Sequence, residues 1–538
     1  MFLGPVLGYM IWTVSTLERN VRKARQLNVP YICLPIDGNN VLWAAFQPYI
    51  WSILDRLPFK WVSYPDFVRY SRRGWEYADR SDTHVHLGPV WALITPVAVY
   101  LQFADPGAVN EIFTRRSDFV RPVKEYKLLE VYGPCVSTAG DDWARHRRVL
   151  AAPFNESIME FVWDESLRQA RSMLRYWSSA GDAGIPTFCK SYEFRGSADP
   201  KTDEASSYRN SLQTVLDNIV PLMLIPYHFL ASPIVPKRWA RVGNAAVSFK
   251  EHMAEMLEEE TTALDQGKPG SGDKGTNSSN LDTNNFKRGL SVNEIFGNVF
   301  VINFAGHDTT AITLAFSMLL LAANPLVQEW ISEEISAVTK DMPTEEWDYK
   351  TLFPALNRCR AVLLETLRVY PPIMGLPKWT SQRAQTITVR DRTLTIPPGV
   401  STVLCLKAIQ SHPDYWPDPH TWKPSRWISQ ATSVSTPPIG QYLNEQLLTP
   451  KPNTYFPWSD GPQKCPGKKF AEVEAVAVFA CLFKQHRLLI EKKAHESDEA
   501  AQKRAIACSN DVRLEALLKM ANADQVTLIC NQVLGSGP

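Results

Sequence analysis

WSDGPQKCPGKKF, residues 458–470, is the stretch of this sequence that decides its fold and chemistry. Cys465 lies between Gly461 and Gly467, with a proline on each side, and a helix is predicted to begin near Lys468. Glycines allow a tight turn and the close approach of a flat ligand. Backbone N–H groups and a helix N-terminus beside the sulfur favour the thiolate. The pattern predicts a thiolate ligand, and the alternative is a structural cysteine in a turn.

The other cysteines indicate which metal this thiolate would bind. The chain has nine cysteines, an odd number, and no CxxC pair, so the sequence predicts neither a disulfide framework nor a zinc site. Zinc needs three or four protein ligands, whereas haem iron needs few because the porphyrin supplies four. A lone thiolate at Cys465 therefore indicates haem.

The composition sets broad limits on the function. The chain has 538 residues, 45% of them hydrophobic, which is enough for a large core. Its formal net charge of +1 gives no electrostatic reason to expect a nucleic-acid partner.

The N-terminal region predicts an association with a membrane. Residues 1–17 are apolar or small, and four basic residues follow between positions 19 and 25. This length is at the lower limit for a spanning helix, so residues 1–18 are interpreted as a membrane anchor, with an interfacial or core-packing helix as the alternative. Basic charge after the apolar run would keep the following domain in the cytosol. We expect residues 19–60 to be a linker and membrane-proximal segment.

Hydrophobic periodicity over the rest of the chain predicts a mainly α-helical protein with small β-sheets. Residues 292–323 form the longest apolar stretch, but polar residues from Asn303 to Thr310 at its middle favour a buried core helix over a membrane span. A further helix is expected over residues 320–339. Short strands are expected at 90–103 and 386–406. Residues 266–289 are too polar and glycine-rich to pack, so a mobile loop is expected there.

Five motifs in order resemble those of the cytochrome P-450 superfamily, in particular microsomal-type members of filamentous fungi. The segment around Cys465 resembles the family's cysteine-ligand loop, and the other four are WARHR at 143–147, AGHDTT at 305–310, ETLR at 365–368 and WKPSRW at 422–427. The resemblance implies the cytochrome P-450 fold over residues 61–538, a single large catalytic domain with haem between the long central helix and the cysteine-ligand loop.

The resemblance also implies roles for individual residues. Cys465 would ligate the iron of haem b, and Gly306 would open a groove for dioxygen. Thr309 and Asp308 would activate dioxygen and relay protons. Because a threonine hydroxyl can bond to the carbonyl four residues back, we expect Thr309 to do so. Trp143 and Arg147, one helical turn apart, would reach the haem propionates.

Two positions depart from the family pattern near the propionates. Gln463 occupies a position where the family commonly has arginine, and Lys378 stands where another arginine is often found. One propionate contact would then be a neutral hydrogen bond instead of an ion pair.

Glu365 and Arg368 are three residues apart and therefore share one helix face. With Arg426 they can form a buried charge network, which the family uses to hold the segment beneath the haem. The alternative is an ordinary solvated pair on the helix surface.

The predicted activity is external monooxygenation of a lipophilic small molecule, a terpenoid or polyketide of fungal secondary metabolism. The chain is too short for a fused flavin domain, so NADPH electrons would come through a separate cytochrome P-450 reductase, with cytochrome b5 as a further donor. The expected location is the endoplasmic reticulum membrane, with the catalytic domain facing the cytosol.

Two other functions stay open at this point. One is a haem-thiolate isomerase or dehydratase that needs no reductase, although the intact Asp308-Thr309 pair counts against it. The other is a membrane-anchored haem-binding protein without turnover.

Overall fold

The structure is a computed structural model that describes residues 3–38, 40–179, 185–186, 208–265, 289–429 and 445–533. The expected mobile loop at 266–289 lies, apart from Gly289, outside the described residues. The chain divides into two compact units that interleave along the sequence. Unit 1 comprises Met1–Pro122, Leu367–Trp422 and Thr449–Cys465, and unit 2 comprises Val123–Thr366, Lys423–Leu448 and Pro466–Pro538.

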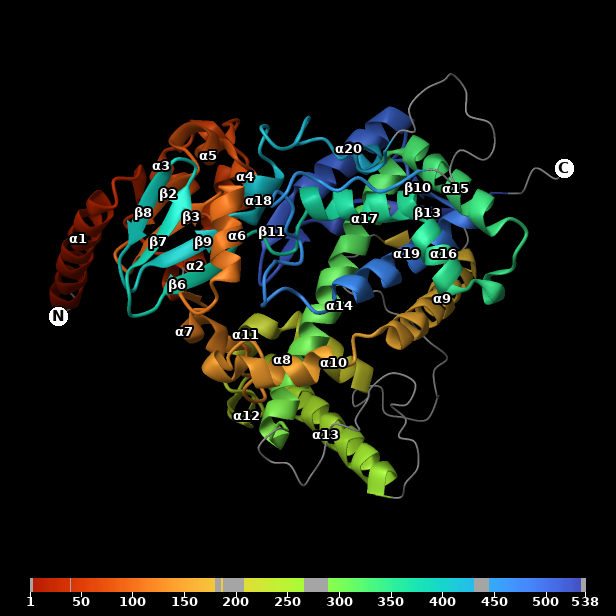
Figure 1. The fold of residues 1–538 in the computed structure, drawn as a ribbon, viewed down its shortest axis with the longest axis horizontal. Coiled ribbons are helices and arrows are strands. Elements are labelled where there is room, and N and C mark those ends of the chain that lie inside the picture. Colours follow the sequence, from red (N-terminus) through yellow and green to blue (C-terminus); the bar gives the residue numbers. More distant parts are fainter. Residues whose placement is uncertain are drawn as a thin grey trace. The chain divides into compact units, whose positions relative to one another are not determined.

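Unit 1 is built on a six-stranded sheet, with strand order β1-β2-β3-β9-β6-β4 (Figure 1). These strands are β1 (Tyr31–Cys33), β2 (Val90–Ile94), β3 (Val99–Phe103), β4 (Phe119–Val120), β6 (Leu376–Thr380) and β9 (Ser401–Leu404). A separate hairpin consists of β7 (Gln385–Val389) and β8 (Arg392–Ile396). The helices of unit 1 are α1 (Leu3–Gln26), α2 (Val41–Leu54), α3 (Asp66–Arg69), α4 (Trp75–Asp79), α5 (Asp82–Leu87), α6 (Pro106–Thr114) and α18 (Leu406–Gln410).

The sheet of unit 1 is part of a hydrophobic core to which helices and the β7–β8 hairpin also contribute. All five residues of β2 are buried, and Phe113 of α6 belongs to the same hydrophobic cluster as the β7–β8 hairpin. Ala24 in the last turn of α1, and Leu27 just after the helix, also join this cluster. Asn20 donates a hydrogen bond of 2.8 Å to the Thr95 carbonyl, so α1 is fixed to the β2–β3 turn well past residue 18.

Unit 2 is mainly helical (Figure 1). Its helices are α7 (Val123–Tyr126), α8 (Trp143–Ala151), α9 (Glu156–Ser179), α10 (Tyr208–Asp217), α11 (Ile219–Leu224), α12 (Tyr227–Leu230), α13 (Lys237–Asp265), α14 (Val292–Ala323), α15 (Pro325–Thr339), α16 (Tyr349–Ala355), α19 (Lys468–Gln485), α20 (Asp498–Asn510) and most of α17 (Asn357–Val369). Its strands are β5 (Ile185–Pro186), β10 (His486–Ile490), β13 (Thr527–Gln532) and the hairpin β11 (Val512–Leu514) and β12 (Leu518–Met520).

Helix α14 is the long helix that the sequence predicts, and it begins and ends at the predicted residues. Ser291 caps it through a reciprocal pair of hydrogen bonds with Glu294. Every residue from Ile312 to Ala323 is buried. In the described part of the chain, α14 alone is long and apolar enough to cross a membrane, and most of it is buried inside the protein, as expected for a core helix.

The single helix expected over residues 320–339 is wrong, because α14 ends at Ala323 and α15 begins at Pro325. Asn324 has φ −129° and ψ 74°, which ends one helix before the next begins. Proline lacks an N–H and disfavours helical backbone in the residue before it, so it fits the first position of α15 and not a helix interior.

Candidate cofactor site

The Cys465 loop of unit 1 has the tight backbone that its glycines predict. The Cys465 N–H donates to the Trp458 carbonyl over 2.8 Å and closes the loop. Gly461 has φ +67°, and a Cβ built there would lie 2.5 Å from the Phe113 carbonyl oxygen. No other residue fits position 461 without moving the backbone. Gly467 is the N-cap of α19, which begins at Lys468 as expected.

Cys465 is the only exposed cysteine in the described ranges of the chain. Burial raises the pKa of Cys481 to about 12 and that of Cys530 to about 11. Burial also raises the pKa of Cys405 well above its usual range. Because a metal binds the thiolate, buried thiols of this kind are poor ligands, and Cys465 is the best-placed candidate.

Lys378 and Gln463 lie together in unit 1. Lys378 is 4% exposed on β6, and its Nζ donates to Gln463 Oε1 over 2.6 Å. Burial, with the nearby positive charge of Arg121, lowers the pKa of Lys378 to about 8. A negatively charged group beside Lys378 would stabilise the charged form of this desolvated ammonium group. The pair therefore fits a carboxylate ligand, with Gln463 orienting the lysine.

The middle of α14, in unit 2, is exposed although the helix is otherwise largely buried. Ala305, Gly306 and His307 are exposed. A Cβ built at Gly306 would meet nothing within 4 Å, so the backbone there borders open space. The Thr309 hydroxyl donates to the Ala305 carbonyl over 2.6 Å, which confirms the predicted bond to the carbonyl four residues back.

Asp308 lies beside Lys519, a contact that was not predicted from the sequence. His307 Nδ1 lies 3.2 Å from Asp308 Oδ1, and Lys519 Nζ lies 3.4 Å from Asp308 Oδ2. Burial acts to raise the pKa of Asp308, but the His307 hydrogen bond and the Lys519 charge outweigh it, so the pKa lies below its usual value. Lys519 is on β12, and nothing in the local sequence signals a contact with α14.

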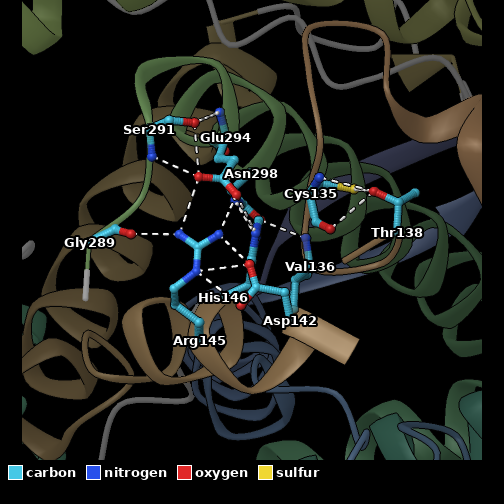
Figure 2. A network of polar contacts seen from close by, with 10 residues as sticks. All are labelled: Cys135, Val136, Thr138, Asp142, Arg145, His146, Gly289, Ser291, Glu294 and Asn298. Atoms are coloured by element: carbon cyan, nitrogen blue, oxygen red, sulfur yellow. Dashed lines mark hydrogen bonds and ion pairs between the residues drawn. The ribbon is translucent and has the colours of Figure 1, made fainter. Parts of the chain in front are cut away.

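Helix α8 begins at Trp143, which is buried, and Arg147 follows one turn later. Figure 2 shows how the residues between them fix α8 to the start of α14. Arg145 donates to Glu294 Oε2 over 3.2 Å and to the Gly289 carbonyl over 2.6 Å. Arg145 is therefore engaged inside unit 2.

His146 completes this network through both of its ring nitrogens. Its Nε2 lies 3.0 Å from Glu294 Oε1, and its Nδ1 lies 3.0 Å from the Asn298 amide nitrogen (Figure 2). A carboxylate only accepts and an amide nitrogen only donates, so Nε2 carries the proton and Nδ1 accepts. Asn298 Oδ1 in turn accepts from the Val136 N–H over 2.8 Å.

Asp142, His146 and Glu294 place possible metal-ligand atoms within 4.8 Å of one another. However, Arg145 donates to both carboxylates. The Arg145 hydrogen bonds, the largest influence, lower the pKa of Glu294 to about 2. We assign the cluster as an ion-pair network that already contains its cation.

We expect Glu294→Gln to destabilise the protein by about 1–3 kcal/mol at neutral pH, because hydrogen bonds to a charged group are lost. The depressed pKa of Glu294 means that its contribution is complete above its unfolded pKa near 4.5 and declines as the pH falls toward about 2. Urea unfolding of both proteins at pH 7 and pH 4 measures this. Glu499→Gln, which removes the exposed partner of Lys503, is the control and should change stability by less than about 0.5 kcal/mol. A difference between wild type and Glu294→Gln that is equal at both pH values would contradict the assignment.

Glu365 is fully buried in unit 2, and both of its carboxylate oxygens accept hydrogen bonds. Oε1 accepts from Arg426 Nε over 2.9 Å and from the Lys423 N–H over 2.8 Å, and Oε2 accepts from the Trp427 indole over 2.9 Å. The predicted Glu365–Arg426 pair is confirmed. The indole and backbone donors were not predicted.

Arg368 is also fully buried, in unit 1. Its guanidinium donates to the carbonyl oxygens of Gln410 at 2.9 Å, Pro419 at 2.7 Å and Thr421 at 3.1 Å. Since Glu365 and Arg368 are both inaccessible, the alternative of a solvated surface pair is excluded.

Comparisons with known proteins agree with these features. The family model described as Cytochrome P-450 matches residues 80–511. A cytochrome P-450 monooxygenase of Arthrobotrys oligospora is 27% identical over 98% of this chain and 97% of the relative. A cytochrome P-450 monooxygenase of Penicillium roqueforti is 25% identical over 91% of both chains. A monooxygenase of the phomenoic acid biosynthesis cluster of Leptosphaeria maculans is 26% identical over 91% of both chains.

Proposed function

Because the chain belongs to the cytochrome P-450 family and is a haem-thiolate monooxygenase, we propose that it oxidises a terpenoid or polyketide of fungal secondary metabolism. The oxidation inserts one oxygen atom from dioxygen into this lipophilic molecule. Support for the metabolic role comes from the relatives, one of which is named for a phomenoic acid biosynthesis cluster. The observation that carries the chemistry is the exposed Cys465 in its glycine-bracketed loop.

The residues described above fit haem b. Cys465 would ligate the iron, and Gly306 would leave room for the flat macrocycle. Gly461 and Gly467 would allow the cysteine loop to turn tightly before α19. As the family resemblance implies, Lys378, Gln463, Trp143 and Arg147 would bind the propionates. When bound through Cys465, the haem supplies an iron that activates dioxygen, with electron density donated by the thiolate.

Asp308 and Thr309 move protons for this reaction. Asp308 is ionised at neutral pH because its pKa is lowered, so it can accept a proton on the solvent side. The Thr309 hydroxyl, now bonded to the Ala305 carbonyl, can turn to offer its proton and accept the one that Asp308 releases.

The electrons come from NADPH through a separate cytochrome P-450 reductase, with cytochrome b5 as a further donor. The protein is bound to the endoplasmic reticulum membrane and faces the cytosol. Residues 1–18 serve as the anchor, 19–60 as the membrane-proximal segment and 61–538 as the catalytic domain. Helices α1 and α2 support this, since both expose apolar side chains that include Met10, Ile11, Phe46, Tyr49 and Ile53.

Thr309→Ala tests the proposed reaction. In the reductase-coupled system with NADPH, we expect this variant to release most of its consumed NADPH as hydrogen peroxide, several-fold more than wild type, because the proton needed for O–O cleavage is misdirected. The measurement is hydrogen peroxide released per NADPH consumed with 7-ethoxycoumarin, a lipophilic probe.

Thr261→Ala is the matched control, because Thr261 makes the same bond to a carbonyl four residues back, at 2.7 Å, on an exposed face of α13. Its peroxide yield should equal that of wild type. If wild type consumes no NADPH with reductase but converts a lipid hydroperoxide, the monooxygenase proposal is wrong and the isomerase alternative is right.

A further inference from the structure

Unit 2 contains a cavity of about 430 Å³ between α9, α14 and α19. Its wall is largely apolar, with Phe161, Leu314 and Met318 among the lining residues. The titratable side chains in this wall are His307 of α14, Glu474 of α19 and Glu165 of α9. A volume of this size holds several water molecules, and the polar groups can bind them.

His307 connects this cavity with Asp308. Its side chain is 40% exposed and lines the cavity, while Nδ1 lies 3.2 Å from Asp308 Oδ1. Imidazole can take a proton at one ring nitrogen and release another from the second. Because Nδ1 is at the carboxylate, Nε2 is the nitrogen available to water in the cavity.

Glu474 provides the acid on the cavity side. Burial raises the pKa of Glu474 to about 7, opposed by the positive charge of His307. Its carboxyl is therefore protonated and ionised in comparable amounts at neutral pH, so it can both donate a proton and recover one from water.

The other charged groups nearby are already paired. Glu165 accepts from Arg168 at 2.7 Å and from Gln169 at 2.6 Å. On the far side of Asp308, Lys519 lies 3.4 Å from Oδ2 and keeps the carboxylate ionised and in place. Asp308 Oδ1 is thus the oxygen that faces a proton donor, and His307 is that donor.

We propose that His307 carries protons from this cavity to Asp308, with Glu474 as the donor on the cavity side. One proton passes from the Glu474 carboxyl through cavity water to Nε2 as another leaves Nδ1 for Asp308 Oδ1. Glu474 is then reprotonated from solvent. The imidazole regains its first tautomer when Nε2 releases its proton to cavity water and Nδ1 takes one from solvent, to which the side chain is 40% exposed. Each cycle therefore moves one proton from solvent to Asp308 and leaves His307 and Glu474 as they began. The inference rests on the proposed function, since it supplies the protons that Asp308 relays.

His307→Gln is the sharpest test, because an amide can keep a hydrogen bond to Asp308 but cannot carry a proton. With reductase, NADPH and 7-ethoxycoumarin, we expect NADPH consumption to slow by about tenfold, and its solvent deuterium isotope effect to increase. The carbon monoxide spectrum should stay unchanged. His252→Gln is the matched control, because His252 lies 3.3 Å from Glu255 on α13, in a comparable histidine–carboxylate pair. It should behave as wild type.

Glu474→Gln gives a second, independent readout. In wild type the donor form of Glu474 is lost as the pH rises through about 7, so turnover should fall above that pH. The variant should be slow throughout and should lack this decline.

Wild-type rates and isotope effects in His307→Gln, or an unchanged pH profile in Glu474→Gln, would overturn the proposal. A wild-type protein that consumes no NADPH with reductase would instead refute the proposed function, so the two failures can be told apart.

Discussion

Cys465→Ala is expected to abolish NADPH-dependent oxidation by the reconstituted enzyme completely. The Cys465 thiolate is the protein ligand that we propose for the haem iron, and no other cysteine in the described ranges is exposed. Without the thiolate, the iron loses both its protein bond and the electron donation that favours O–O cleavage. The measurement is product formation and NADPH consumption by purified variant and wild type at equal protein concentration.

Cys530→Ala is the control for this experiment. Cys530 is only partly buried, so its removal leaves little empty space, and it is on β13, away from the Cys465 loop in sequence. This variant should retain wild-type turnover. Measurable oxidation by Cys465→Ala, or its loss in both variants, would contradict the assignment of the ligand.

Glu365→Gln is expected to destabilise the protein by about 3–5 kcal/mol, which is the cost of leaving a buried charge without its partner. Glu365 accepts from a guanidinium, an indole and a backbone N–H, and all three donors lose the negative charge that they share. Glutamine has a similar size, but its amide group brings hydrogens toward donors that need an acceptor. Most of the variant should fail to accumulate as holoprotein, measured by haem content per milligram of purified protein.

Glu329→Gln is the control that separates the effect of burial from the effect of losing any ion pair. Glu329 accepts two hydrogen bonds from Arg487, both of 2.8 Å, but the Glu329 side chain is 57% exposed. An exposed pair of this kind contributes about 0–1 kcal/mol. Equal losses of stability in the two variants would show that the Glu365 network is no more than a surface pair.

Local features of the sequence predicted local structure well. The apolar run over residues 292–323 predicted α14, and the Thr309 bond to the Ala305 carbonyl follows from helix geometry alone. Pro325 could have been recognised as the end of α14, because proline cannot continue a helix. The apolar run through residues 320–323 concealed this signal.

Contacts between distant segments could not be predicted in the same way. Lys519 meets Asp308 across 211 residues of sequence, and Arg145 meets Glu294 across 149. Such pairs depend on how elements pack, and neither lysine nor arginine is unusual on an exposed strand or helix. Gln463 and Lys378 were expected as separate propionate contacts, whereas the structure shows a direct hydrogen bond between them.

The N-terminal helix likewise has one part that the sequence predicts and one part that depends on packing. The apolar residues 1–17 and the basic residues after them favour an anchor, but sequence could not show that α1 continues to Gln26 and packs its last turns on the sheet of unit 1. Helix α2 lies within the segment expected to be near the membrane, and it exposes apolar side chains that include Phe46, Tyr49 and Ile53.

The central claim is that Cys465 ligates a haem iron as thiolate. Its most direct test is the absorbance difference spectrum of the dithionite-reduced protein with and without carbon monoxide. We predict a strongly red-shifted Soret band in wild type that is absent from Cys465→Ala. A band at the position typical of histidine ligation, or a red-shifted band that persists in Cys465→Ala, would contradict the claim.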